Sequence, residues 1–84
     1  MKTLTDAVDL LEEGNWEAAH GIAQANDTKL GAWAHGIVHM LEGDRRNAGY
    51  WYGRAGRELP GQERIADEIA ALKSELTGQG RPRR

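Results

Sequence analysis

The sequence predicts an all-α domain of about five short helices, and three observations support this fold class. Apolar residues recur at helical spacing in five segments of the chain. No segment alternates apolar and polar residues over the length of a strand. Residues typical of helix caps and turns separate the five segments. Because the connections are short, neighbouring helices should pack antiparallel around one core.

The chain has 84 residues, enough for one small core and too few for a second of useful size. We assign residues 1–76 to a single helical domain. Residues 77–84 hold three arginines and no acidic residue, so we expect a flexible basic tail there.

The first two helices are predicted in the N-terminal third of the chain. Thr3 or Thr5 can cap the first helix, and Gly14 can end it. Asn15 can cap the second helix. The predicted buried positions are Leu4, Ala7, Val8 and Leu11 in the first helix and Trp16, Ala19, Ile22 and Ala23 in the second.

The remaining helices are predicted over residues 29–42, 45–57 and 62–76. Gly43 and Asp44 can end one helix and cap the next, and Pro60 marks the break before the last. The predicted buried positions are Leu30, Trp33, Ala34, Ile37, Leu41, Ala48, Trp51, Tyr52, Ala55, Ile65, Ile69, Leu72 and Leu76.

Glycines inside the predicted helices need an explanation, because each costs about 1 kcal/mol relative to alanine. They are Gly21, Gly31, Gly36, Gly49, Gly53 and Gly56. We expect Gly49 and Gly53 to allow close packing beside the consecutive aromatic residues 50–52, and Gly56 to end a helix.

Composition excludes several classes of protein. Eleven Lys and Arg against thirteen Asp and Glu exclude a nucleic-acid binder driven by overall charge. The absence of cysteine excludes disulfides, thiolate metal sites and a thiol nucleophile. No apolar segment is long enough for a membrane helix, and the N-terminus lacks a secretory hydrophobic region. We therefore expect a cytoplasmic protein that binds neither nucleic acid nor membrane.

An internal repeat appears in the two segments that start at Gly14 and Gly43, which lie 29 residues apart. In both, the glycine is followed by Asn or Asp, and a small residue (Ala19 or Ala48) stands five residues after it. This arrangement is typical of a turn that joins the two helices of a repeating hairpin.

Together with Trp33 and the segment Tyr-Trp-Tyr-Gly-Arg-Ala-Gly at residues 50–56, the pattern resembles tetratricopeptide and Sel1-like repeats, best over residues 29–57. With His35, His39 and Glu42 included, it is similar to a small family of tetratricopeptide-like proteins without an assigned activity. The resemblance implies two helix hairpins with a C-terminal capping helix, and a partner groove that uses Asn47 and Arg54. The spacing of 29 is shorter than the usual 34, and Gly49 replaces a larger residue.

A candidate binding face lies on the fourth predicted helix. Asn47, Tyr50, Arg54 and Arg57 follow the spacing i, i+3, i+7 and i+10. An amide, a phenol and two guanidinium groups on one face can hold a carboxylate or a phosphate. We therefore predict a small binding module for a protein or peptide segment or an anionic ligand, with His35 and His39 lining the same cleft. The alternative is an ordinary solvated face.

A second hypothesis is a metal- or small-ligand-binding protein. His35, His39 and Glu42 lie at i, i+4 and i+7, away from the apolar stripe of their helix. His20 and Glu17, three residues apart on the second helix, could converge with them as ligands for Zn, Ni, Cu or Fe. The alternative is ordinary electrostatics on a helix surface. A third hypothesis is a structural homodimer.

No enzymatic activity is predicted. Ser74 is the only serine, and no histidine lies near it in the sequence. A histidine-based or metal-dependent activity is the alternative. We expect no cofactor, with a divalent metal as the alternative.

Overall fold

The computed structural model describes residues 2–78, which form five α-helices and contain no strand. The helices are α1 (Leu4–Glu12), α2 (Trp16–Gln24), α3 (Lys29–Glu42), α4 (Arg45–Arg54) and α5 (Ile65–Thr77), with a single 3-10 turn, η1 (Gln62–Arg64), before α5. The predicted all-α fold of about five helices is confirmed. None of these helices has the length and apolar character to cross a bilayer.

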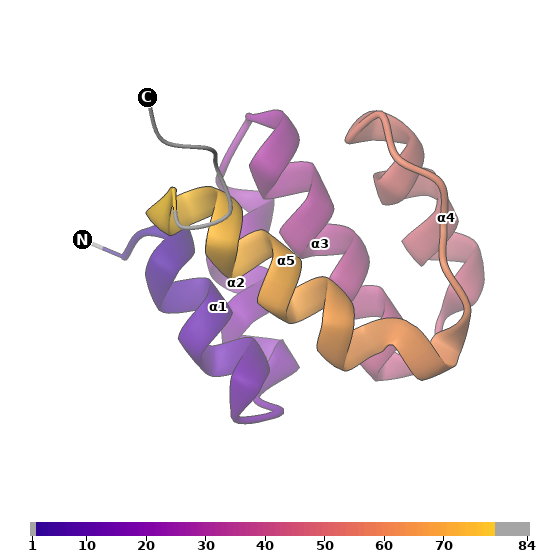
Figure 1. The fold of residues 1–84 in the computed structure, drawn as a ribbon, viewed down its shortest axis with the longest axis horizontal. Coiled ribbons are helices and arrows are strands. Elements are labelled where there is room, and N and C mark those ends of the chain that lie inside the picture. Colours follow the sequence, from indigo (N-terminus) through magenta and orange to yellow (C-terminus); the bar gives the residue numbers. More distant parts are fainter. Residues whose placement is uncertain (1, 79–84) are drawn as a thin grey trace.

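Helix α3 lies at the centre of the bundle. It packs against α2 and α4, its neighbours in the chain, and α5 crosses over both α3 and α1 (Figure 1). Residues 31–38 are all buried, so this part of α3 is covered on every side. The pairs α1–α2 and α3–α4 form the two helix hairpins, and α5 closes the bundle over their first helices.

Local capping chemistry sets the starts of the first four helices. In each case a side-chain oxygen of the N-cap residue accepts a hydrogen bond from a backbone N–H in the first turn. The four N-cap residues are Thr3, Asn15, Thr28 and Asp44. The predicted boundaries of α1, α2 and α3 are confirmed to within about two residues.

The ends of α4 and α5 differ from the prediction. Helix α4 ends at Arg54, three residues before the predicted end, because the chain turns at Gly56, where φ is +75°. Gly56 therefore ends the helix, as expected. Residues 62–64 form the 3-10 turn instead of the first turn of α5. In the predicted tail, Thr77 still belongs to α5 and Gly78 is its C-cap, while residues 79–84 lie outside the described residues.

The segment between α4 and α5 runs back along α4 (Figure 1). The guanidinium group of Arg45, at the start of α4, donates to the Pro60 carbonyl and to the Gln62 side chain, each at 3.0 Å. The amide of Gln62 donates to the backbone carbonyl of Met40 in α3. These bonds hold the segment in place and set where α5 begins.

The core follows the predicted apolar stripes, with some differences in depth. Trp33, Tyr52, Leu11, Ile37 and Leu72 are fully buried, as are Met40 and Val38, which the helical spacing did not select. Several predicted core residues are only partly buried and pack on the edge of the core: Trp16, Ile22, Leu30, Leu41, Trp51, Ile65 and Leu76.

The prediction of close packing at Gly49 and Gly53 is wrong. A Cβ atom added at Gly53 would meet nothing within 4 Å, and one at Gly49 would make only an ordinary 3.7 Å contact with Leu59. The close approach between α3 and α4 occurs instead at Gly36, where a Cβ atom would lie 2.5 Å from Cδ1 of Tyr52. A second close approach occurs at Gly31, next to Asn26.

A partly buried polar network joins α3, α4 and α5. Oε1 of Glu68 accepts a hydrogen bond from the indole N–H of Trp33 at 3.0 Å and another from the hydroxyl of Tyr52 at 2.8 Å. The guanidinium carbon of Arg57 lies 3.4 Å from the centroid of the Trp33 ring. One carboxylate oxygen therefore satisfies the polar atoms of the two largest side chains in the core.

The stability of the protein is expected to fall at alkaline pH because of Tyr52. Burial of its phenol, followed by the hydrogen bond to Glu68, raises the pKa above the usual value of 10.0. Above pH 10.0 the phenol of Tyr52 loses its proton in the unfolded chain but keeps it in the native state. The free energy of unfolding should then decrease by about 1.4 kcal/mol per pH unit. Urea titrations from about pH 9 to about pH 11 measure this slope.

Tyr52→Phe should remove this part of the slope, whereas Tyr50→Phe, at an exposed tyrosine, should leave it. If the pH dependence of Tyr52→Phe matched that of the original chain, burial of the phenol would not be its cause.

Candidate metal centre

All three histidines of the chain meet at the contact between α2 and α3. His20 comes from α2, and His35 and His39 come from α3. The spacing i, i+4 places the two α3 residues on one face, and this face packs against α2. One nitrogen from each ring lies within 4.8 Å of one nitrogen from each of the other two. The ring centroids are 4.6 to 5.5 Å apart.

His35 is the buried member of this group, with 5% of its surface exposed. Its ring stacks on that of Trp51 with 3.9 Å between centroids and an interplanar angle of 10°. Its Nδ1 atom is buried and has no hydrogen-bond partner. Leaving a buried polar atom unpaired costs about 1–3 kcal/mol, so this nitrogen calls for an explanation.

The protonation state of His35 follows from its surroundings. Burial is the largest cause, and the neighbouring His20 and His39 add to it, so that the pKa falls from 6.5 to about 4. The ring is therefore neutral near neutral pH. The neutral imidazole is the form that coordinates a metal ion.

A carboxylate fixes the orientation of His39. Its Nδ1 atom lies 2.7 Å from Oε1 of Glu42, one helical turn further along α3. Nε2 is therefore the nitrogen of His39 that remains for coordination. A metal-binding histidine commonly donates its other ring N–H to a carboxylate, which fixes the tautomer and raises the basicity of the ligand.

This arrangement separates the sequence-predicted ligands into two sets. His20, His35 and His39 come together, whereas Glu42 bonds to His39 and does not join the three-histidine group. Glu17 is exposed and lies outside the group as well. His39, Glu42 and Asp44 form a second group of close polar atoms, in which Asp44 already caps α4 through the backbone of Asn47.

The dimensions of the three-histidine group are close to those of a metal site. Zinc binds imidazole nitrogen at about 2.0–2.1 Å, which places two nitrogens of a tetrahedral site about 3.4 Å apart. The nitrogens here already lie within 4.8 Å of one another, on two helices that pack directly together. A tetrahedral site would require the nitrogens to lie closer together than this 4.8 Å limit.

The predicted binding face and these histidines do not lie together in either of the two cavities described below. The amide nitrogen of Asn47 donates to Asp44 at 2.7 Å, and the guanidinium group of Arg57 lies over the Trp33 ring. Only Tyr50 and Arg54 remain together, joined by a 3.0 Å hydrogen bond at the surface. Because α4 ends at Arg54, Arg57 does not lie on the same helix face as Asn47, Tyr50 and Arg54, as the prediction assumed.

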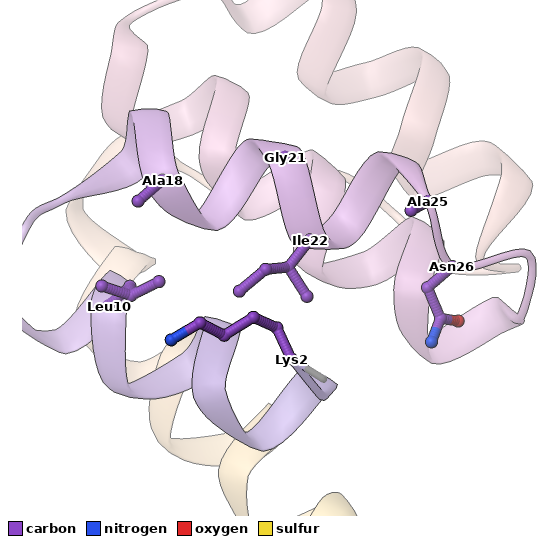
Figure 2. Close-up of a pocket in the computed structure, with 7 residues that line it drawn as sticks. All are labelled: Lys2, Leu10, Ala18, Gly21, Ile22, Ala25 and Asn26. Atoms are coloured by element: carbon purple, nitrogen blue, oxygen red, sulfur yellow. The ribbon is translucent and has the colours of Figure 1, made fainter.

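The sequence did not indicate an open groove of about 700 Å³ between α1 and α2. Leu10, Ile22 and the aliphatic part of Lys2 face this space in Figure 2. The small residues Ala18, Gly21 and Ala25, at i, i+3 and i+7 on α2, leave the room for it. That spacing is the signal that could have found the groove, which holds no predicted site residue.

A smaller cavity of about 90 Å³ lies at the start of α3 and is lined in part by Lys29, Trp51 and Arg54. Arg54 is therefore the one predicted site residue that lines either of these two cavities.

Comparison of the chain with protein-family models, with curated proteins and with solved structures found no match in any of the three. The resemblance to tetratricopeptide and Sel1-like repeats therefore stays a prediction. The case for a function depends on the geometry of the three histidines.

Proposed function

We propose that this protein binds a divalent transition-metal ion through His20, His35 and His39. The observation that carries the proposal is the convergence of every histidine in the chain on one point between α2 and α3. Helical spacing accounts for the proximity of His35 and His39, but not for His20, which lies on another helix. A common ligand accounts for all three.

The buried Nδ1 atom of His35 supports the same function. An apolar side chain at this position would avoid the cost of an unpaired nitrogen in the core. Packing of the imidazole against Trp51 explains its burial but gives this atom no partner. A metal ion between α2 and α3 would supply an electrophile to the group and would link the two helices.

The donor set points to a particular class of metal. Imidazole nitrogens suit Zn, Ni, Cu and Fe, whereas Mg and Ca prefer oxygen ligands. The chain has no cysteine, so thiolate coordination does not compete. Zinc is the appropriate first probe because it has no redox chemistry and accepts tetrahedral imidazole sites.

Zinc is expected to bind with one ion per chain and to raise the melting temperature. A free-metal concentration of about ten times the dissociation constant adds about 1.4 kcal/mol to the stability of the native state. For a domain of this size the melting temperature should rise by about 6 °C or more. Isothermal titration calorimetry gives the stoichiometry, and thermal melts followed by circular dichroism give the shift.

Variants at the two partly exposed histidines test the ligand set. His20→Gln and His39→Gln should each weaken zinc binding by at least about 100-fold, beyond the usual effect of losing an outer-shell partner. Glu17→Gln, which changes an exposed acidic residue of α2, the helix of His20, is the control and should bind zinc like the original chain. No zinc binding by the unaltered chain would refute the proposal without any variant.

The functions predicted first from the sequence stay predictions. A peptide- or anion-binding module has less support from the geometry, because Asn47 and Arg57 are engaged within the chain and Tyr50 and Arg54 bond to each other. The proposed homodimer and the absence of enzymatic activity also stay predictions.

A further inference from the structure

We infer that the proposed metal centre keeps one coordination position for an exchangeable small inorganic anion. This inference rests on the proposed function and specifies what the same site would bind. The geometry that carries it is a group of three imidazoles, one buried and two partly exposed, which no carboxylate joins among residues 2–78.

The first step concerns the supply of donors in the chain. His20, His35 and His39 are its only histidines, and it has no cysteine. The carboxylate of Glu42 contacts the group, but it does so at Nδ1 of His39. That atom lies on the opposite edge of the ring from Nε2, so Glu42 orients the ligand from outside the coordination sphere.

Asp44 is no better placed to complete the site. Its carboxylate accepts hydrogen bonds from the backbone N–H and the side-chain amide of Asn47, at 3.2 and 2.7 Å, as the N-cap of α4. Releasing it would leave the first turn of α4 without a cap, which typically costs about 1 kcal/mol. Metal sites with three protein ligands characteristically hold water or another exogenous ligand in the fourth position.

The second step concerns access. His35 lies at the bottom of the group, where Trp51 covers one face of its ring. His20 and His39 are partly exposed, and 13% of the His39 side chain is accessible. His35 would therefore bind the metal on the side of the core, and His20 and His39 would bind it on the side nearer to solvent. An open coordination position would be reached from solvent past these two partly exposed rings.

The third step concerns charge. Three neutral imidazoles supply no negative charge to a divalent ion, so an open position can take a small anion as well as water. Within residues 2–78, no carboxylate neutralises this charge from inside the group. A monodentate anion such as azide or thiocyanate is a suitable probe because it needs only one coordination position.

Cobalt(II) provides a direct test on the full chain. Its visible absorption bands report the number and type of ligands, and Co²⁺ takes up the same imidazole sites as zinc. The loaded protein should show a band shift that saturates as azide is added, with one azide per metal ion. Thiocyanate should give a different spectrum with the same stoichiometry. Glu17→Gln, at an exposed residue outside the three-histidine group, is the control and should show the same azide response.

The outcomes separate this inference from the proposed function. If Co²⁺ binds and azide leaves the spectrum unchanged, the coordination sphere is closed by the chain and the inference is wrong, while metal binding stands. A doubling of the mass by sedimentation on metal loading would place a second chain in the open position and would also overturn it. Failure of Co²⁺ to bind would instead refute the proposed function.

Discussion

Gly36→Ala is expected to destabilise the protein by about 2–3 kcal/mol, although alanine is the better helix former. The added methyl group would lie 2.5 Å from Cδ1 and 2.8 Å from Cε1 of Tyr52, well inside contact distance. Tyr52 cannot move away easily, because its ring is fully buried and its hydroxyl is bonded to Glu68. The α3–α4 contact must therefore open, at a cost greater than the gain in helix propensity.

The matched control is Gly53→Ala in α4, where the added methyl group meets no atom within 4 Å. Here only the helix propensity changes, and the variant should be more stable by about 0.5–1 kcal/mol. Urea unfolding followed by circular dichroism measures both values. Equal effects of the two substitutions would contradict the close approach of α3 to α4 at Gly36.

This pair of glycines illustrates which parts of the fold the sequence could predict. Helix starts and stops depend on a few adjacent residues, so the caps at Thr3, Asn15 and Asp44 and the left-handed stop at Gly43 were predictable. Which glycine faces a neighbouring helix depends on how two helices rotate about their axes. The prediction favoured Gly53 because it lies beside the aromatic residues in sequence, and this choice was wrong.

The histidine group was predictable in part for the same reason. The i, i+4 spacing places His35 and His39 on one face without knowledge of the rest of the fold. The addition of His20 needed the packing of α2 on α3 and was only one of the options that the sequence left open. The bond between Glu42 and His39 is local, and it changes Glu42 from an expected ligand into a residue that orients one.

The role of Glu68 could not be predicted from spacing. It lies 35 residues from Trp33 and 16 residues from Tyr52, and it occupies a helix rich in charged residues. In the sequence it looks like one more exposed acidic residue of that helix. Only the crossing of α5 over α3 brings its carboxylate to the indole and the phenol.

Glu68→Leu is expected to lower the free energy of unfolding by about 3 kcal/mol, the other large effect that the structure predicts. The indole N–H of Trp33 and the hydroxyl of Tyr52, which belong to two fully buried side chains, would both lose their acceptor. Glu68→Gln keeps an oxygen at the same position, so its loss should be about 1 kcal/mol, from the weaker acceptor alone. Urea unfolding followed by circular dichroism measures both losses.

A double-mutant cycle distinguishes this explanation from a general effect of the substitution. Tyr52→Phe removes one of the two donors, so that Glu68→Leu made in the Tyr52→Phe variant leaves a single buried group unpaired instead of two. The second substitution should then cost about 1 kcal/mol less than in the original chain. Strict additivity would mean that the hydroxyl of Tyr52 gains nothing from Glu68. The loss would then have to come from the indole N–H of Trp33 left without its acceptor, or from the packing of leucine between α3 and α5.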